Sequence, residues 1–347
     1  MKYLLYLAKW YSVPIVEPLV EHFRTTGRDY RFYVSAKIRR EFPQQWDSNL
    51  ILTDLTAAKA YRPDFVLAPG NFVDFRIPGV KVQLFHGLGV EKPVHYAIRH
   101  FFDVFLTSGP YVTGRFRQLQ QRWRYFDVIE TGWVKLDRIL SFPATGLREK
   151  YGIPATAKVI LYAPTFSSNM QSASDLLPYL KTAMRDGEYW LLKFHEFMPR
   201  ELIDSFRVLP PDRARIIHNE DITPYLHLAD LMISDTSSVV YEFLALNKPV
   251  ITYRTIDLKN KAYDITDPTL LQTAVVGCLP YPASLRQGRD LAIATVNPYL
   301  DCRTAQRITT ALEQLDPSHY PKPGKPLNLI RKLQVIFHHN FKKGYLR

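Results

Sequence analysis

The sequence predicts an α/β protein with two doubly wound domains, each a parallel sheet flanked by helices. Short apolar segments alternate with segments whose apolar residues recur at helical spacing, and this alternation occurs in both halves of the chain. A length of 347 residues suits two domains of ordinary size. A hydrophobic content of 46% and a charged content of 22% are typical of globular proteins.

The first half contains six short apolar segments that predict strands, and we expect them to form one domain over residues 1–131. These strands are expected at residues 3–8, 30–34, 65–68, 81–85, 104–107 and 126–130. Helices are expected between them at 13–26 and 111–121. Residues 132–154, with two Pro and three Gly, are predicted to connect this domain to the next.

The second half repeats the alternation, and we expect a domain over residues 155–321. Strands are expected at 159–163, 190–194 and 214–217, and helices near 173–186, 200–206 and 223–228. A strand, a helix and a further strand are expected within 231–253. A helix at 305–315 is expected to cross back between the domains. The two cysteines, Cys278 and Cys302, have no spacing that suits a metal site.

The stretch 229–253, ADLMISDTSSVVYEFLALNKPVITY, is the most informative part of the chain. Its turn places Thr236, Ser237 and Ser238 at a helix N-terminus, beyond the carboxyl end of a probable parallel strand. Open backbone N–H groups, the helix dipole and three hydroxyls make this a candidate phosphate site. The alternative is that the serines are ordinary N-caps.

Four segments, in the same order along the chain, resemble the motifs of a known family. They are LFHGLG (84–89), VILYAPTF (159–166), LLKFHEF (191–197) and DITPYLHLADLMISDTSSVVYEFLALNKPVITY (221–253). Together they resemble the CDP-glycerol glycerophosphotransferases of teichoic acid and related capsule synthesis. The resemblance implies the GT-B fold, in which two Rossmann-like domains face each other across a cleft.

The chain departs from the family pattern at three positions. Thr236 stands where the family usually has Tyr, Glu91 where it commonly has Lys, and Glu196 where it usually has Pro. Lys92 follows Glu91 directly. The extra domain of the long polymerising members is not present in this sequence, so transfer of few units, or of one, is expected.

The resemblance implies a donor site in the second domain. We expect Thr165, His195, Ser237, Ser238 and the helix dipole to clamp the diphosphate of a CDP-alditol, most simply CDP-glycerol. Lys193 is expected either to join this clamp or to neutralise Asp235 beneath the turn. The segment from Asn219 through Ile222 to Thr223 is expected to form the cytosine pocket through backbone groups. Glu242 either binds the ribose hydroxyls or is a surface residue.

The resemblance also implies a catalytic base in the first domain. His86 follows a predicted strand, and Gly87 and Gly89 would let backbone approach a ligand closely. We expect His86 to take the proton of an acceptor hydroxyl, which attacks the β-phosphorus and releases CMP. The alternative is a histidine held structurally by a carbonyl group. Asp235 is the only acid in the turn, so no metal and no other cofactor is expected.

The C-terminal segment, residues 322–347, is strongly basic, with seven Lys or Arg and no Asp or Glu. An apolar stripe of helical spacing accompanies the basic residues, and this combination is typical of a helix in a membrane interface. The stripe comprises Leu329, Ile330, Leu333, Ile336, Phe337 and Phe341, and Arg331, Lys332, Gln334, His338, Lys342 and Lys343 lie largely outside it.

We therefore expect a cytoplasmic enzyme that docks peripherally on the anionic inner face of the membrane, where a lipid-linked or polymer acceptor lies. The alternative is a helix packed on the core. No nucleic-acid motif accompanies the basic residues, so no nucleic-acid partner is expected. Two other functions stay open. One is a GT-B glycosyltransferase or UDP-sugar 2-epimerase, and the other is a non-catalytic membrane-docked scaffold.

Overall fold

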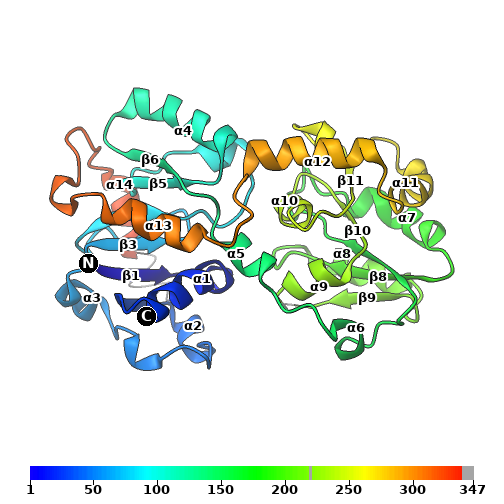
Figure 1. The fold of residues 1–347 in the computed structure, drawn as a ribbon, viewed down its shortest axis with the longest axis horizontal. Helices are drawn as coiled ribbons and strands as arrows, with labels where there is room; N and C mark the ends of the chain where they lie inside the picture. The colour runs from blue at the N-terminus through cyan, green and yellow to red at the C-terminus, as the bar shows by residue number, and fades with distance from the viewer. Residues whose placement is uncertain (219–220, 338–347) are drawn as a thin grey trace. The chain divides into compact units, whose positions relative to one another are not determined.

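The computed structural model describes residues 1–218 and 221–337 of the chain. The described chain divides into two compact units (Figure 1). Unit 1 contains Met1–His86, Tyr96–Arg138 and the chain from Asn297 onward. Unit 2 contains Gly87–His95 and Ile139–Val296. Each unit has its own six-stranded parallel sheet, so the two doubly wound α/β domains predicted from the sequence are confirmed.

The sheet of unit 1 has the strand order β2-β1-β3-β4-β5-β6, and every pairing in it is parallel. Most of its strands are apolar on both sides because helices cover both faces of such a sheet. The strands are β1 Lys2–Leu7, β2 Asp29–Val34, β3 Phe65–Ala68, β4 Val80–Gln83, β5 Val104–Thr107 and β6 Asp127–Glu130.

The helices of unit 1 alternate with these strands. α1 packs against β1 and against the late helix α13, whereas α4 packs against β5 and β6 (Figure 1). The helices are α1 Ser12–Thr25, α2 Ala36–Arg40, α3 Leu55–Tyr61, α4 Pro110–Trp123, α13 Thr304–Glu313 and α14 Leu329–Phe337, with short 3₁₀ turns at Ser48–Leu50 and Pro317–His319. A further 3₁₀ turn, Pro93–Tyr96, contains the point where the chain returns from unit 2 to unit 1.

The sheet of unit 2 has the order β12-β11-β10-β7-β8-β9 and is also parallel throughout. Its two central strands, β7 and β10, are neighbours although two other strands separate them in the sequence. The strands are β7 Lys158–Tyr162, β8 Glu188–Lys193, β9 Ala214–Ile217, β10 Leu231–Ser234, β11 Val250–Tyr253 and β12 Tyr263–Ile265.

The helices of unit 2 enclose this sheet and its apolar core. Trp190, Leu231 and Ile251 are fully buried in that core, and α7 and α11 pack against each other over it. The helices are α6 Leu147–Lys150, α7 Ala173–Ala183, α8 Arg200–Ser205, α9 Thr223–Leu228, α10 Val239–Leu244, α11 Leu271–Cys278 and α12 Ala283–Val296, with 3₁₀ turns at Phe206–Val208, Lys259–Lys261 and Pro268–Leu270. α5, Lys135–Leu140, contains the point where the chain passes from unit 1 to unit 2.

The domain boundaries differ from the predicted ones at two places. Residues 297–321 lie in unit 1, not in the second domain, because polar contacts hold them there. The side-chain oxygen of Asn297 accepts the backbone N–H of Trp133 at 2.8 Å, and Ala305 N–H donates to Asp137 at 2.9 Å. Helix α13 therefore packs within unit 1 and does not cross between the units. The loop Gly87–His95 lies in unit 2, although it was predicted to belong to the first domain.

Three predicted elements also differ locally. Residues 132–154 contain the passage between the units, as expected of a connection, and also the short helices α5 and α6. Strand β4 ends at Gln83, two residues early, because Phe85 has a left-handed backbone with φ of 59°. The helix expected over 173–186 ends at Ala183. The spacing of apolar residues did not predict β12, α11 or α12.

The proline-rich segment Pro321–Pro326 is docked on unit 1. Lys322 forms an ion pair with Asp127 at 2.6 Å, and Lys325 forms one with Asp103 at 2.6 Å. The amide of Asn328 then donates to the carbonyl oxygen of Arg99 at 2.8 Å. Helix α14 follows this anchored segment. In the described ranges, no helix is both long enough and apolar enough to cross a bilayer.

We predict that Lys325→Met destabilises unit 1 more than Lys322→Met does. Asp103 is buried, with a side chain only 4% exposed, and would lose its cationic partner. Removal of one partner from a buried pair costs roughly 3 kcal/mol, whereas a half-exposed pair such as Lys322–Asp127 contributes about 1 kcal/mol or less. Urea unfolding measures both changes. Equal losses in the two variants would contradict the distinction.

Candidate functional site

The candidate site of unit 2 lies at the carboxyl edge of its sheet, where the strand order reverses. The chain continues from β7 and from β10 in opposite directions along the sheet, and ligands of such sheets bind at this reversal, so we call the edge beside the loops after β7 and β10 the crevice. Thr165 follows β7, and Asp235 begins the turn after β10. His195 follows β8, the other neighbour of β7. The strand order thus brings these predicted residues to one edge of the sheet.

Asp235 joins the two loops of the crevice. One carboxylate oxygen accepts the backbone N–H of Thr165 at 2.9 Å, and the other accepts both the backbone N–H and the hydroxyl of Ser172 at 2.9 Å. Asp235 is fully buried. Burial raises the pKa of this carboxyl to about 6, against the effect of its hydrogen-bond donors and of Lys92.

The hydroxyl-bearing turn differs from a simple helix cap. Thr236 is buried, and its hydroxyl oxygen accepts the N–H of Ile256 at 3.3 Å, so this side chain supports the turn. Ser237 and Ser238 are half-buried. Ser238 occupies the N-cap position of α10, but its side chain makes no capping hydrogen bond. Because α10 has only six residues, its dipole contributes less than the sequence analysis assumed.

His195 is a neutral hydrogen-bond donor. Its ring lies 4.3 Å from the ring of Phe166 and 5.2 Å from that of Phe197, measured between centroids. Desolvation, together with the charges of Lys193 and Lys92, lowers the pKa of His195 to about 4. Nδ1 accepts the backbone N–H of Phe197 at 3.2 Å. The neutral ring therefore carries its proton on Nε2, which is left to donate.

The two lysines near the crevice have different surroundings. Lys193 donates to the carbonyl oxygen of Phe194 at 3.5 Å, and its charge acts on His195. Lys92 donates to the hydroxyl oxygen of Thr165 at 3.0 Å, and its charge acts on Asp235. Lys92 therefore contributes to the neutralisation of Asp235, and both roles considered for Lys193 stay predictions. From the sequence, Lys92 was expected to lie in the first domain, and no role was predicted for it.

Glu91, the neighbour of Lys92, is buried in a polar cluster of unit 2. One carboxylate oxygen pairs with Lys261 at 2.7 Å and accepts the hydroxyl of Tyr241. The other oxygen accepts the hydroxyl of Thr255 at 3.1 Å. The side chains of Glu91 and Lys261 are 4% and 1% exposed. The sequence predicted no role for Glu91, which was identified only as a departure from the family pattern.

Gly87 is the closest point of the same loop to the turn after β10. A Cβ atom at this position would lie 3.0 Å from the hydroxyl oxygen of Ser238 and 3.3 Å from its Cβ. Any side chain at residue 87 would therefore displace Ser238. The close approach at Gly87 is thus to the side chain of Ser238, and the expected approach to a ligand stays a prediction.

The other predicted donor-site residues lie at the same edge or within α10. Thr223 begins α9 with a fully buried side chain, and its hydroxyl donates to Asp221 at 3.1 Å. Ile222 is the N-cap of that helix, and Asn219 lies outside the described residues. Glu242 is 4% exposed, so the surface alternative for this side chain is wrong.

His86 lies in unit 1, at the end of the segment that leaves β4. The left-handed Phe85 precedes it, and the carbonyl oxygen of Phe85 accepts the indole N–H of Trp133 at 3.1 Å. The His86 ring is exposed and lies 5.6 Å from the ring of Tyr11, measured between centroids. A buried indole thus fixes the backbone next to an exposed imidazole. His100, by contrast, packs on Trp123 as expected of a structural residue.

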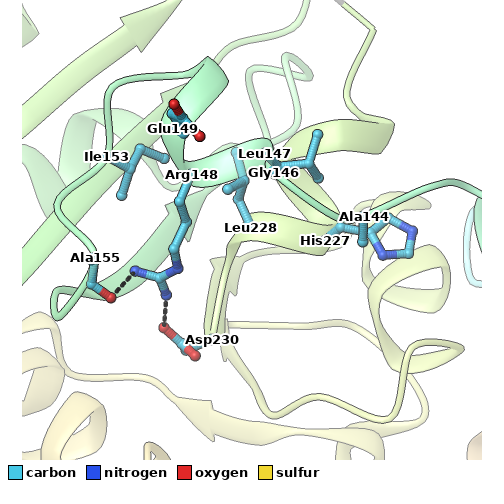
Figure 2. Close-up of a pocket in the computed structure, with 10 residues that line it drawn as sticks. All are labelled: Ala144, Gly146, Leu147, Arg148, Glu149, Ile153, Ala155, His227, Leu228 and Asp230. Carbon is cyan, nitrogen blue, oxygen red and sulfur yellow. Dashed lines mark hydrogen bonds and ion pairs between the residues drawn. The ribbon is translucent and has the colours of Figure 1, made fainter.

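A cavity of about 480 Å³ lies at the opposite edge of the unit 2 sheet, near the amino ends of β7 and β10 (Figure 2). Arg148 lines this cavity. Its guanidinium group donates to the carbonyl oxygens of Pro154, Ala155 and Ala157 and contacts Asp230 at 3.4 Å. Asp230 in turn accepts the N–H of Val159. These charged groups are engaged with the protein, so the cavity is a structural feature remote from the crevice.

Comparison of the sequence with protein families matches residues 101–264 to the CDP-glycerol:poly(glycerophosphate) glycerophosphotransferase model. The chain is 28% identical over 292 residues to the teichoic acid glycerol-phosphate primase of Bacillus spizizenii, covering 74% of this chain and 70% of that protein. It is 26% identical over 165 residues to the teichoic acid glycerol-phosphate transferase of Staphylococcus aureus, covering 44% and 41%.

Solved structures resemble the chain over most of its length. The wall teichoic acid polymerase TagF aligns with a TM-score of 0.64 and 17% identity, over 90% of this chain and 88% of that one. A putative UDP-N-acetylglucosamine 2-epimerase from Listeria monocytogenes aligns with a TM-score of 0.66 and 14% identity, over 91% and 97%. Likeness at this identity shows the fold, and the predicted GT-B class is confirmed.

We predict that Asp235 makes the stability of unit 2 depend on pH. Its folded pKa of about 6 exceeds the ordinary value of 3.8, so the native state binds this proton more tightly. The stabilisation is fully present below about pH 4 and is lost as the pH rises through about 6. Because asparagine does not titrate, the unfolding free energy of the wild type relative to Asp235→Asn should fall across this window.

Urea unfolding at a series of pH values between about 4 and 7 measures this difference. Asp186→Asn, at a side chain 96% exposed in the same unit, controls for the loss of a surface carboxylate. A difference that stays flat, or that rises with pH, would show that the buried carboxyl is not held in its protonated form.

Proposed function

We propose, since this chain belongs to the CDP-glycerol glycerophosphotransferase family, that it transfers glycerol phosphate from CDP-glycerol to a hydroxyl group of a lipid-linked or polymer acceptor. One observation carries the proposal. The family model covers residues 101–264, and this span contains Thr165, His195 and the turn with Ser237 and Ser238. The donor groups at the reversal of the unit 2 sheet are therefore the groups within the matched segment.

The crevice of unit 2 suits a diphosphate because nearly all its polar groups donate hydrogen bonds. His195 offers Nε2–H, Lys92 and Lys193 carry positive charge, and Ser237 and Ser238 have half-buried hydroxyls. Asp235 is an acceptor, but its three hydrogen bonds to the protein engage both oxygens. We assign the diphosphate of the donor to this crevice, the cytosine to the backbone near Ile222 and Thr223, and the ribose to Glu242.

His86 is proposed as the general base, with the acceptor bound by unit 1. The acceptor hydroxyl gives its proton to the imidazole, and its oxygen forms a bond to the β-phosphorus. The bond from this phosphorus to the bridging oxygen breaks, and CMP leaves with the bonding electron pair. Donors fixed around the diphosphate stabilise the charge on the leaving phosphate. Trp133 supports this role, since it fixes the backbone beside an exposed ring.

We predict that the wild-type protein releases CMP from CDP-glycerol and that His86→Ala lowers turnover by roughly 10²- to 10⁴-fold, the usual effect of a lost general base. Donor binding should stay nearly unchanged, because the proposed clamp contains no part of His86. Turnover follows from CMP release with a teichoic acid acceptor, and calorimetry measures donor affinity. His319→Ala, at a side chain 75% exposed, is the matched control.

Two outcomes would contradict this assignment in different ways. Near-normal turnover in His86→Ala would make His86 structural and leave the reaction intact. Selective binding of UDP-N-acetylglucosamine over CDP-glycerol, in the same calorimetric series, would favour the epimerase or glycosyltransferase alternative. Binding of CDP-glycerol without any release of CMP would favour the scaffold.

We further propose that the chain acts at the inner face of the membrane through α14. Unit 1 contacts this helix through buried Val335 and through Lys332, whose ammonium lies over the ring of Phe75. The apolar stripe does not make this contact. Four of its residues remain exposed by about half or more, with 63% for Leu329, 76% for Ile330, 52% for Leu333 and 59% for Phe337, whereas Ile336 is partly buried.

Such a row of exposed apolar side chains is rare on a helix that merely packs on its own protein. The tail is also free of acids, so an anionic bilayer is the surface that fits it, at about 1 kcal/mol for each basic residue near the lipid. Phe341 of the predicted stripe, and His338, Lys342 and Lys343 of the polar face, lie outside the described residues.

We predict that Leu329→Asp combined with Leu333→Asp abolishes co-sedimentation with vesicles that contain anionic lipid, and leaves donor binding and thermal stability unchanged. High salt should release the wild type from such vesicles. Leu291→Asp is the matched control, since Leu291 is 65% exposed in unit 2. Deletion after Pro326 should have the same effect as the double substitution. Unfolding or aggregation of either variant without lipid would show that the stripe stabilises the core.

A further inference from the structure

The loop Gly87–His95, here called the inserted loop, has an unusual position in the chain. The residues before and after it belong to unit 1, whereas the loop itself belongs to unit 2. Its contacts with unit 2 therefore fix its position, although both flanking segments belong to unit 1. Glu91 provides such contacts through Lys261, Tyr241 and Thr255, all of them buried.

The cluster around Glu91 is fully paired. Lys261 donates to the hydroxyl of Thr255 at 3.0 Å and to the carbonyl oxygen of Asp257 at 3.1 Å, in addition to its ion pair. A buried ion pair with every group satisfied defines one geometry, because any displacement would leave a charge unpaired in a dry environment. The backbone of residue 92 is therefore held at a fixed place beside the crevice.

The groups of the Glu91 cluster are paired. The ammonium group of Lys92, by contrast, has more N–H donors than hydrogen-bond partners among the described residues. An ammonium group has three N–H donors. Within the described ranges, the hydrogen bond and ion-pair partners of Lys92 comprise only the neutral hydroxyl of Thr165, at 3.0 Å. Because Thr165 accepts this hydrogen bond, its own proton is available to a ligand. The charges of Asp235 and Glu91 act on this half-buried cation, but neither carboxylate forms an ion pair with it, so the ammonium has donors left for an anionic ligand.

We infer that Lys92 binds the diphosphate of the nucleotide donor and that Glu91 positions it by docking the inserted loop on unit 2. The inference rests on the function proposed above, and it adds a phosphate ligand from outside the segment that the family model matches. Lys92 is the binding residue. Glu91 and Lys261 act through it and have no contact with the donor.

Calorimetric titration with CDP-glycerol, CDP and cytidine tests the binding role. Lys92→Met should weaken CDP-glycerol and CDP roughly 10- to 100-fold, the effect of one lost charge-assisted contact. Cytidine, which has no phosphate, should bind as it does to the wild type. Lys92→Arg should restore most of the loss. Lys158→Met removes an exposed lysine at the opposite edge of the same sheet and is the matched control.

The positioning role needs a second measurement, because Glu91→Gln alone leaves buried Lys261 without its partner. The double variant Glu91→Gln with Lys261→Met removes both charges and keeps the volume. In this background, Lys92→Met should weaken CDP-glycerol much less than it does in the wild type, since Lys92 is no longer held at the crevice. An undiminished effect in that background would overturn the role of Glu91.

The outcomes separate this inference from the proposed function. In one outcome, the wild type binds CDP-glycerol more tightly than cytidine, and Lys92→Met binds CDP-glycerol with the same affinity as the wild type. Lys92 is then not a phosphate ligand, and the proposed function stands. If the wild type shows no preference for CDP-glycerol over cytidine, the donor assignment itself fails. A loss for all three ligands in Lys92→Met would indicate a structural lysine and would also overturn the inference.

Discussion

The buried carboxylate of Asp235 is the interaction on which the candidate site depends. Parallel strand order brings the loops after β7 and β10 to one edge of the sheet, but it also separates them there. Asp235 spans this separation, since it holds Thr165 with one oxygen and Ser172 with the other. The crevice has a fixed shape because a single side chain fastens one wall to the other.

The same carboxylate determines the chemistry of the crevice. A negative charge next to a bound phosphate would weaken phosphate binding. Burial raises the pKa of the Asp235 carboxyl to about 6, which reduces the fraction of this group that is charged. Its hydrogen bonds to the protein engage both oxygens, so the groups left for a ligand are donors. In the proposed donor site, the positive charge of Lys92 acts both on Asp235 and on the phosphates of the ligand.

Sequence reasoning recovered the features that depend on neighbouring residues. The two parallel sheets, the strand ends at Thr165 and His195, and the Asp235 turn all follow from apolar spacing and motif order, which are local properties. Lys92 could not be found in this way, because its partner lies 73 positions further along the chain and the inserted loop crosses the unit boundary. The placement of residues 297–321 was missed for the same reason, since Asn297 and Trp133 meet over 164 positions.

The two histidines singled out by the sequence are therefore suited to different tasks. Desolvation, together with the charges of Lys193 and Lys92, lowers the pKa of His195 and keeps its ring neutral, so Nε2–H can donate a hydrogen bond but the ring is not a protonated acid at neutral pH. His86 is exposed, beside Tyr11 and an anchored backbone, and this exposure suits the proposed role of taking a proton from an acceptor hydroxyl. An incoming diphosphate would reverse the electrostatic balance at His195, because an anion raises the pKa of a neighbouring imidazole. The hydrogen bond from this ring consequently strengthens as negative charge accumulates on the phosphate, which is when stabilisation accelerates transfer.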